Sequence, residues 1–576
     1  MAQGPSKLAL ALIAALAAAL TGAAPAGADF SRSIRTTMLL SRAHDGGFPD
    51  GPSRNAFVSA DQRIARVVAY ESDATNIITD DSNGLTDVFV AKRAQPWKKS
   101  GSLWLYGGTD LVSRGRGGQP ANGRSYRPVT DGDSQHKASC VAFVSEASNL
   151  VPGDTNGVAD AFVYRLGSSQ IDRVSVDSRG RQADGPTYDV SVDGECARVA
   201  FTADAPNLAL REPRDGWKSA ITNRPRRGKQ QVYVRFLKGE GNYRRFKGIT
   251  FLASASDTGR AGNRASYDVQ MARKGTTLAF TSEATNVAGR DSSRRADVYV
   301  RTIDRFIPRR SETHSHELLL RTRLVSATRS GRAGNGASSH PAINTDGRYV
   351  AYETEATNLA SDSNGPMSDI IRADLGREAQ GRGPPKQHLV SRSDFGQANG
   401  PSHRPSISAV GWFVVFDSEA TNLRPSSHGS DLNGERDVQM WYDRSNRASI
   451  ESRDSDNRAL RAPSQQPSIG LHGNYVAFES VDPLIDVPLL QTFKPALAEL
   501  VEKVDDITAA RNPSGVQLDY SFVPNLLDAD AAAPDPSQAV VGKPAADPAF
   551  HQIYLRYIGP CARTVIEAGH VRCLLR

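Results

Sequence analysis

The chain has 576 residues, with 70 Lys and Arg against 63 Asp and Glu, and a formal net charge of +7 at pH 7. Because the two signs are mixed along the chain, the charge indicates no specific nucleic-acid binding. The length allows several ordinary domains. Folds built from repeated units, however, can run large as single domains, so we expect one large domain with insertions.

The first 28 residues have the layout of a cleavable secretory signal. One cation, Lys7, precedes an apolar stretch from Leu8 to Leu20, and small residues lead to Ala28. The stretch is short for a bilayer span, no later segment reaches about 18 continuous apolar residues, and no cysteine follows to carry a lipid. We predict a signal peptide over residues 1–28 and an exported, soluble monomer, secreted or periplasmic, that does not span the membrane.

An apolar triplet that ends in an aromatic residue recurs seven times along the chain, usually followed by an acidic, Asn-containing turn. The triplets begin at residues 68, 141, 199, 278, 350, 414 and 476. This spacing is too long for a solenoid turn but suits a four-stranded blade with variable loops. It therefore predicts a β-propeller.

The sixth copy shows the repeating unit as four strand-like segments, LVS, PSIS, VVF and DVQMW, separated by turn residues. In such a blade PSIS is innermost, VVF second and DVQMW third, and the LVS of the next copy is outermost. The last copy ends at 551–558 with no LVS after it, whereas residues 36–41 form a strand that precedes the first copy. We predict an all-β, seven-bladed propeller closed by this N-terminal strand, which leaves no sheet edge open.

The pattern from Pro341 to Tyr352, with the SEATNL and NGxxDVFV segments, resembles the TolB-type, WD-repeat-like propellers of bacteria. The resemblance covers residues 36–482 and 551–558 and implies the fold, since propellers host many unrelated functions. The chain has no recognisable α/β domain before the blades, so the resemblance by itself does not imply TolB's partner binding. We expect a propeller over 29–482, an insertion over 483–550 with a helix at 489–511, a last strand over 551–558 and a tail over 559–576.

Four cysteines occur in a chain that we expect to be exported, where disulfides persist. Sequence alone permits three pairings. Closeness favours Cys140 with Cys196, which would join neighbouring repeats, and Cys561 with Cys573 in the tail. The alternative for the first pair is two buried free thiols.

Acidic loops of the form D-x-N-G-x-x-D precede the third strand of several copies. Oxygen ligands at alternating positions, with Gly at the sharp turn, suit Ca²⁺, and the loops look similar to those of integrin-type propellers. One expected carboxylate is missing each time, and an Asx-type turn explains the same residues. Both interpretations stay open for the candidate ligands Asp81, Asn83, Asp87, Asp154, Asn156, Asp160, Asp362, Asn364, Asp369, Asp431, Asn433 and Asp437.

An Asn ends the turn after most triplets. Its even recurrence around the ring indicates a structural turn rather than a ligand contact. The positions are Asn76, Asn149, Asn207, Asn286, Asn358 and Asn422.

Insertions break the symmetry of the repeat. On the face of the acidic loops, the basic segment 209–230 and the segment 483–550 are the expected partner surface, or a lid over the channel. On the opposite face, basic residues interleaved with Trp97, Trp104 and Tyr243 suit a polyanion such as an envelope phosphopolymer, with solvated loops as the alternative. The candidate polyanion-binding residues are Lys98, Lys99, Arg244, Arg245, Lys247, Arg309 and Arg310.

No motif in the sequence announces a reaction, because G-x-S-x-G, H-E-x-x-H, P-loop and paired C-x-x-C patterns are missing. We therefore expect a non-catalytic propeller that binds a protein or a cell-envelope polymer, with Ca²⁺ as the candidate cofactor. The alternative is a lactonase or polysaccharide-lyase type of propeller enzyme with its site at the channel mouth. His, Arg and acidic residues from different blades around one bound metal would favour the enzyme, and repeated Ser, Thr and apolar residues would favour the binder.

Overall fold

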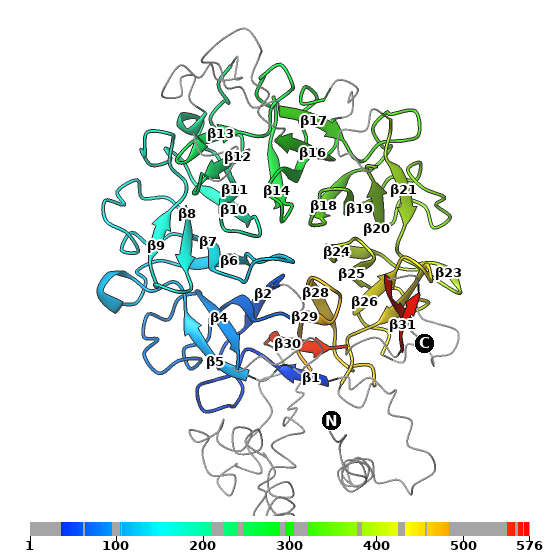
Figure 1. The fold of residues 1–576 in the computed structure, drawn as a ribbon, viewed down its shortest axis with the longest axis horizontal. Helices are drawn as coiled ribbons and strands as arrows, with labels where there is room; N and C mark the ends of the chain where they lie inside the picture. The colour runs from blue at the N-terminus through cyan, green and yellow to red at the C-terminus, as the bar shows by residue number, and fades with distance from the viewer. Residues whose placement is uncertain are drawn as a thin grey trace, which may run out of the picture.

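A computed structural model describes most of the chain between residues 36 and 574 (Figure 1). The expected signal peptide, the expected helix at 489–511 and the rest of the insertion up to residue 549 lie outside the described residues. The described ranges are 36–61, 64–94, 104, 106–209, 223–239, 246–288, 294–303, 320–376, 383–423, 433–454, 458–482, 550–558, 563–567 and 570–574.

Seven antiparallel four-stranded sheets stand in a ring, which we number sheets 1 to 7 in chain order (Figure 1). The innermost strands, one per sheet, are β2 (Ser53–Val58), β6 (Ser125–Thr130), β10 (Thr187–Val192), β14 (Ser266–Met271), β18 (Ser338–Ile343), β24 (Ser402–Ile407) and β28 (Ser464–Ile469). The second strands are β3 (Val67–Ser72), β7 (Cys140–Ser145), β11 (Arg198–Ala203), β15 (Thr277–Ser282), β19 (Tyr349–Thr354), β25 (Phe413–Ser418) and β29 (Tyr475–Ser480).

The outer half of each sheet is built by the next two strands. The third strands are β4 (Asp87–Arg93), β8 (Asp160–Arg165), β12 (Gln231–Phe236), β16 (Asp297–Ile303), β20 (Asp369–Asp374), β26 (Asp437–Tyr442) and β30 (Gln552–Tyr557). The outermost strands are β5 (Tyr106–Leu111), β9 (Ile171–Arg173), β13 (Thr250–Leu252), β17 (Leu320–Leu324), β21 (Lys386–Leu389), β27 (Arg447–Ile450) and β1 (Thr36–Leu39).

Two small hairpins and two short turns complete the described structure. The all-β, seven-bladed fold is confirmed, and helix in the described ranges is confined to two 3-10 turns. No helix in these ranges has the length and apolar character that a membrane span requires. The remaining elements are β22 (Arg392–Ser393), β23 (Gly396–Gln397), β31 (Arg563–Glu567), β32 (His570–Leu574), η1 (Arg116–Gly118) and η2 (Pro206–Leu208).

The seventh sheet draws strands from both ends of the propeller. β1 pairs antiparallel with β30, so that Thr37 lies opposite Arg556 and Leu39 opposite Tyr554. The buried Arg556 side chain donates to Thr37 Oγ1 at 3.0 Å and to Glu451 Oε2 of sheet 6 at 3.1 Å. The N-terminal strand is therefore tied to sheet 7 and, through Arg556, to the neighbouring sheet.

The aromatic residue of each triplet lies in the core. In five sheets it stacks on an aromatic residue of the third strand, with ring centroids 5.7 to 5.9 Å apart. Apolar clusters combine side chains from adjacent sheets, so each blade buries its faces against its neighbours. The stacked pairs are Tyr70 with Phe89, Phe143 with Phe162, Phe201 with Tyr233, Phe280 with Tyr299, and Phe478 with Tyr554.

The recurring Asn holds a turn, as predicted. Asn149 Oδ1 accepts the backbone N–H of Asn122 at 3.1 Å, and its Nδ2 donates to the carbonyl of Pro120 at 2.9 Å. The equivalent residues Asn76, Asn207, Asn286 and Asn422 make the same two kinds of bond. The side chain thus ties the loop that enters the innermost strand to the end of the second strand.

Candidate functional site

A cavity of about 440 Å³ lies at the centre of the ring and is lined by the innermost strands of all seven sheets. Each of these strands begins with a buried Ser or Thr, and two residues later it carries a polar side chain that lines the cavity. We call these seven residues the bulge ring: Asn55, Arg127, Asp189, Asp268, His340, Arg404 and Gln466.

The backbone of the bulge ring is unusual. Six of its members have φ between 49° and 53°, the left-handed region that few non-glycine residues adopt, and Asp189 is the exception. A register shift accompanies the ring residue in every innermost strand. A β-bulge re-aims the side chain and frees the backbone N–H from the sheet.

Carboxylates of the preceding sheet accept several of the freed N–H groups. Glu71 accepts from Arg127 N at 2.6 Å and Glu479 from Asn55 N at 2.7 Å. Sheet 2 carries Val144 at the equivalent position, and Asp189, the ring residue that follows it, is the one with ordinary φ. The remaining pairs are Asp417 with Gln466 N, Glu353 with Arg404 N, and Asp268 with His340 N, at 3.0, 3.3 and 3.4 Å.

One side of the bulge ring is cationic. Glu353 accepts from His403 Nδ1 at 2.9 Å and lies 3.3 Å from His340 Nδ1. Burial acts to raise the pKa of Glu353, but these two imidazoles lower it below its usual value. The bond to Glu353 raises the pKa of His340, with Asp268 adding to it. Arg404 lies beside them, exposed, and its guanidinium forms no ion pair with any residue in the described ranges.

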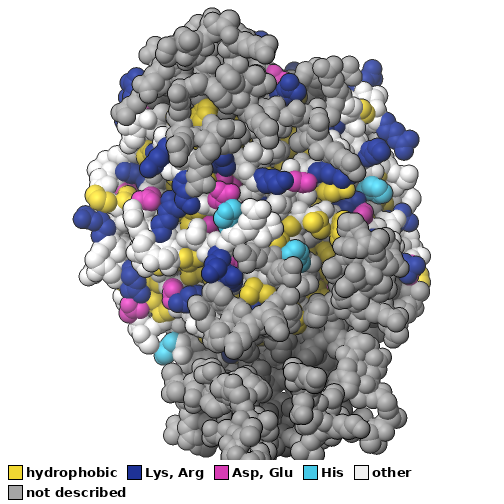
Figure 2. Space-filling model, in the orientation of Figure 1, with side chains coloured by type: hydrophobic (Ala, Val, Ile, Leu, Met, Phe, Trp, Pro, Cys, Tyr) yellow, Lys and Arg dark blue, Asp and Glu magenta, His cyan; other side chains and the backbone are white. Residues whose placement is uncertain are grey.

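The other side of the ring is acidic. Burial raises the pKa of Asp189 to about 6, Asp268 adds to the rise, and Arg127 opposes it. The Arg127 guanidinium lies 3.6 Å from Asp189 Oδ1. Histidine, basic and acidic side chains meet in the middle of the face drawn in Figure 2. A ligand in the cavity therefore meets donors on one side and acceptors on the other.

The far end of the cavity is crossed by the loops between first and second strands. Their backbones hydrogen-bond from sheet to sheet, from Gly132 N to Gly194 O and from Gly194 N to Arg273 O. Arg273 donates to Thr130 O at 2.6 Å, and its guanidinium lies 5.2 Å from the centre of the Phe57 ring. Burial lowers the pKa of Arg273, which Asp131, Asp61, Asp133 and Asp193 oppose. These loops form the floor of the cavity.

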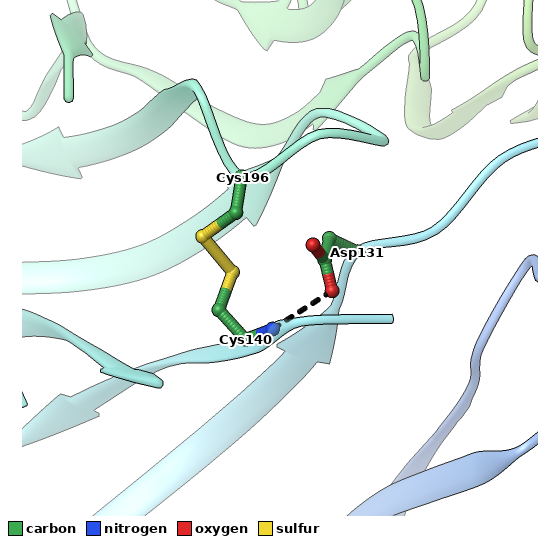
Figure 3. A group of neighbouring side chains, drawn as sticks. All are labelled: Asp131, Cys140 and Cys196. Carbon is green, nitrogen blue, oxygen red and sulfur yellow. Dashed lines mark hydrogen bonds between the residues drawn. A yellow bond between two sulfur atoms is a disulfide. The ribbon is translucent and has the colours of Figure 1, made fainter. Parts of the chain in front are cut away.

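The structure joins Cys140 and Cys196 in a disulfide between sheets 2 and 3 (Figure 3). Beside it, Asp131 accepts from Cys140 N at 2.9 Å, and burial raises its pKa to about 6. Because the two sulfurs bond each other, this trio is not a metal site. Cys561, and hence its expected pairing with Cys573, lies outside the described residues.

Within the described part of the chain, one other group offers three potential metal ligands. His136 Nδ1 lies 3.0 Å from Asp133 Oδ1 and 3.8 Å from Glu195 Oε1, at the floor side of sheets 2 and 3. His136 is exposed, and Asp133 Oδ1 also accepts the backbone N–H groups of Gln135 and His136. The arrangement is therefore satisfied as an Asx-type turn with an imidazole partner.

The acidic loops share a structural role at their last residue. In sheets 1, 2, 5 and 6 this Asp opens the third strand and accepts a bond from a buried Ser. The Ser hydroxyl in turn accepts the backbone N–H of the next residue in the third strand. One oxygen of each final Asp is thus used by the fold. The pairs are Asp87 with Ser113, Asp160 with Ser175, Asp369 with Ser391, and Asp437 with Ser452.

The Asn of each loop is also engaged. Asn83 Oδ1 accepts the backbone N–H of Leu85 at 2.8 Å. Asn156 Oδ1 and Asn433 Oδ1 accept the equivalent backbone N–H groups, those of Val158 and Glu435. Their Nδ2 atoms donate to a carbonyl beyond the outermost strand, as does that of Asn364. The Asx-turn interpretation therefore accounts for Asn83, Asn156 and Asn433, whereas the buried Oδ1 of Asn364 accepts no hydrogen bond from the described residues. Asp431 lies outside the described residues.

Of the candidate polyanion-binding residues, Lys247 is exposed, and Lys98, Lys99, Arg244, Arg245, Arg309 and Arg310 lie outside the described residues. Trp104, expected among them on the surface, is instead 4% exposed and packs edge-on against Tyr475 of sheet 7. The Trp104 ring is part of the apolar cluster shared by sheets 7 and 1, because burying a large indole surface is more favourable than exposing it to water.

No protein-family model and no curated protein matches the sequence. Among solved structures, an oligogalacturonate lyase in complex with manganese shares 11% identity over 78% of this chain and 94% of its own, with a TM-score of 0.41. TolB from Acinetobacter baumannii shares 13% over 78% and 70%, with a TM-score of 0.29. Values of this size identify neither a family nor an activity, and the fold rests on the strand pairing itself.

Sequence reasoning missed the bulge ring. Its signal was present, because the ring residue stands two places after the Ser or Thr that opens the innermost strand, and just before Pro in four copies. This position carries five different polar residue types in the seven copies. Variation at one position of an otherwise regular repeat marks the place where a symmetric scaffold becomes an asymmetric site.

Proposed function

We propose that this is an exported, monomeric propeller that binds a polar, anion-bearing segment of a protein or cell-envelope polymer in its central cavity. The bulge ring carries the proposal, because seven equivalent positions present basic, acidic and neutral polar side chains to one cavity. Export and solubility rest on the layout of residues 1–28. The N-terminal strand is proposed to close the ring that holds the site.

The chemistry of the ligand follows from the two sides of the ring. Arg404 and the imidazole of His340 offer charge-assisted donors to a carboxylate or phosphate. Asp189 and Asp268, at the ring positions of sheets 3 and 4, accept bonds from hydroxyl or amide groups. A cavity of about 440 Å³ holds one or two sugar or amino-acid units, so a chain end or a short segment suits it better than a folded surface.

The test is capture of ligand from the native envelope, followed by calorimetric titration of the captured class. We expect Arg404→Gln to weaken binding about tenfold, because it removes a charge-assisted donor to the anion. Arg332→Gln, an exposed arginine outside the cavity, is the matched control and should bind as wild type does. Equal binding by the Arg404 variant would disprove the cavity as the site. A version without residues 483–549 tests the insertion separately.

A second candidate, an enzyme acting on such a polymer, is favoured by one observation. His340, Arg127, Asp189 and Asp268 come from four different sheets, and the pKa of Asp189 is raised to about 6, within reach of proton exchange near neutral pH. Turnover of uronic-acid oligomers or lactones that is lost in Asp189→Asn, with binding retained, would establish this function in place of simple binding.

A further inference from the structure

The first and last Asp of the acidic loop form a carboxylate pair that the chain itself bridges in two sheets. In sheet 2, Arg173 Nη1 lies 3.0 Å from Asp154 Oδ1 and 3.4 Å from Asp160 Oδ2. In sheet 5, Gln397 Nε2 donates to Asp362 Oδ1 at 2.9 Å and to Asp369 Oδ2 at 2.8 Å. A donor nitrogen therefore stands between the two carboxylates in each case.

Sheet 1 has the same carboxylate pair, Asp81 and Asp87, but neither bridging residue. Leu111 pairs with Phe89 in the register that Arg173 has with Phe162, so an apolar side chain replaces the guanidinium. Pro120 pairs with Arg114 as Gln397 pairs with Arg392, so a ring without a donor replaces the amide. Arg114, whose charge acts on both carboxylates, forms its ion pair with Asp80 at 2.6 Å instead.

Asp81 is left with two buried oxygens and no partner. Both carboxylate oxygens are shut off from solvent, and neither accepts a hydrogen bond of ordinary geometry. Burial, with the charge of Asp87 next, raises the pKa of Asp81 to about 6, although the N–H of Asn83 acts against the rise. Asp50 and Asp80 add further negative charge around it. An unpaired buried carboxylate among like charges is costly unless a cation or a proton occupies the site.

We propose that a hard divalent cation, Ca²⁺, binds in sheet 1 at the place that the Arg173 guanidinium takes in sheet 2. Asp81 supplies its two oxygens, and the Oδ1 of Asp87 is held by Ser113. Asp87 supplies Oδ2, which also accepts from Asn83 Nδ2 at 2.6 Å, just as Asp160 Oδ2 in sheet 2 accepts from both Asn156 and Arg173. Ser82 and Gly84 are exposed, so water reaches the rim and completes the six to eight oxygen ligands that Ca²⁺ takes. The acidic loops of sheets 2 and 5 need no ion, because each supplies its own bridging donor.

The competing occupant is a proton on Asp81, and thermal unfolding of the full mature protein near neutral pH separates the two. With about 1 mM Ca²⁺, the concentration that extracellular calcium modules need, we expect Tm to rise by about 2 °C or more over the value in chelator. Asp81→Asn should lose this response and melt higher than wild type in chelator, because it removes the unpaired charge. Asp154→Asn in sheet 2 is the matched control and should keep the response.

A transplant of the bridge provides a second test that does not depend on removing a carboxylate. Pro120→Gln places in sheet 1 the amide that bridges sheet 5, and we expect it to raise Tm in chelator and to reduce the response to Ca²⁺. Titration calorimetry with Ca²⁺ should show one site in wild type and none in Asp81→Asn. Equal Tm of wild type with Ca²⁺ and chelator, or a response that survives in Asp81→Asn, would overturn the proposal.

Discussion

Single carboxylates hold the bulge ring, and Glu479 shows how. It is fully buried in the second strand of sheet 7, accepts the backbone N–H of Asn55 at 2.7 Å and lies within reach of the amides of Gln465 and Gln466. Burial raises its pKa to about 7, against the opposing hydrogen bonds and Arg404. The folded chain thus binds a proton here more tightly than the unfolded chain does.

The sign of the pH dependence follows from this shift. Because the folded-state pKa lies above the unfolded value of 4.5, the stabilisation by Glu479 is full below that value and is lost as the pH rises through about 7. From about pH 5 to about pH 8 we expect wild type to lose about 1–3 kcal/mol of unfolding free energy more than Glu479→Gln, measured by denaturant titration. Glu355→Gln, at an exposed site, should keep the wild-type slope; identical slopes in all three would contradict the assignment.

At the scale of elements, the loops at the cavity floor link one sheet to the next. The disulfide between β7 and the loop after β10 adds a covalent link to the hydrogen bond from Gly132 N to Gly194 O. Cys140 and Cys196 are both fully buried and are 56 residues apart in the chain. A cross-link over a loop of this length restricts the unfolded chain, which stabilises the folded one.

We expect the double variant Cys140→Ala with Cys196→Ala to fold and to lose about 2–4 kcal/mol of unfolding free energy, by denaturant titration of the oxidised protein. Wild type under reducing conditions in denaturant should shift toward the variant. If the variant and oxidised wild type unfold at the same denaturant concentration, the disulfide contributes nothing to stability.

At the scale of the whole molecule, two segments that are distant in sequence meet in sheet 7. β1 pairs with β30, while Ser480 and Gln552, which flank the long insertion, lie opposite each other in neighbouring strands. The insertion therefore leaves and re-enters the propeller at adjacent points. The N-terminal strand covers a sheet edge, whereas the insertion interrupts no strand pairing among the described residues.

We expect removal of residues 29–42 to abolish cooperative unfolding or to yield an aggregating protein, because β30 loses its outer partner and Arg556 its contact with Thr37. Replacement of residues 483–549 by a short Gly/Ser linker is the comparison, and it should leave Tm close to wild type. Calorimetric melting of both deletions checks this. A truncation at 42 that melts as wild type does would show that the strand is not needed to close the ring.

Sequence periodicity was enough to predict the features that repeat. Each blade must solve the same packing problem, so the apolar triplet, the turn Asn and the Ser and Asp that begin its strands recur and can be recognised without coordinates. The same reasoning predicted four strands per copy and a strand over 36–41, which the structure has over 36–39. It misplaced Trp104, because a loop residue's burial depends on a sheet from the other end of the chain.

The site depended on tertiary structure, because its residues lie roughly one repeat apart in sequence and meet only when the ring forms. Asp268 and His340 become neighbours across two sheets, and the left-handed backbone of His340 donates its N–H to the Asp268 carboxylate of the adjacent sheet. Likewise, Asp81 and Asp154 look alike in sequence. The register of the outer strands shows that Arg173 lies beside Asp154, whereas Leu111 takes the equivalent place in the sheet of Asp81. Periodicity in the sequence was thus enough to predict the scaffold. Which repeated positions form the cavity site, and which acidic loop lacks a bridging side chain, could be seen only in the tertiary structure, because the residues involved are distant in sequence.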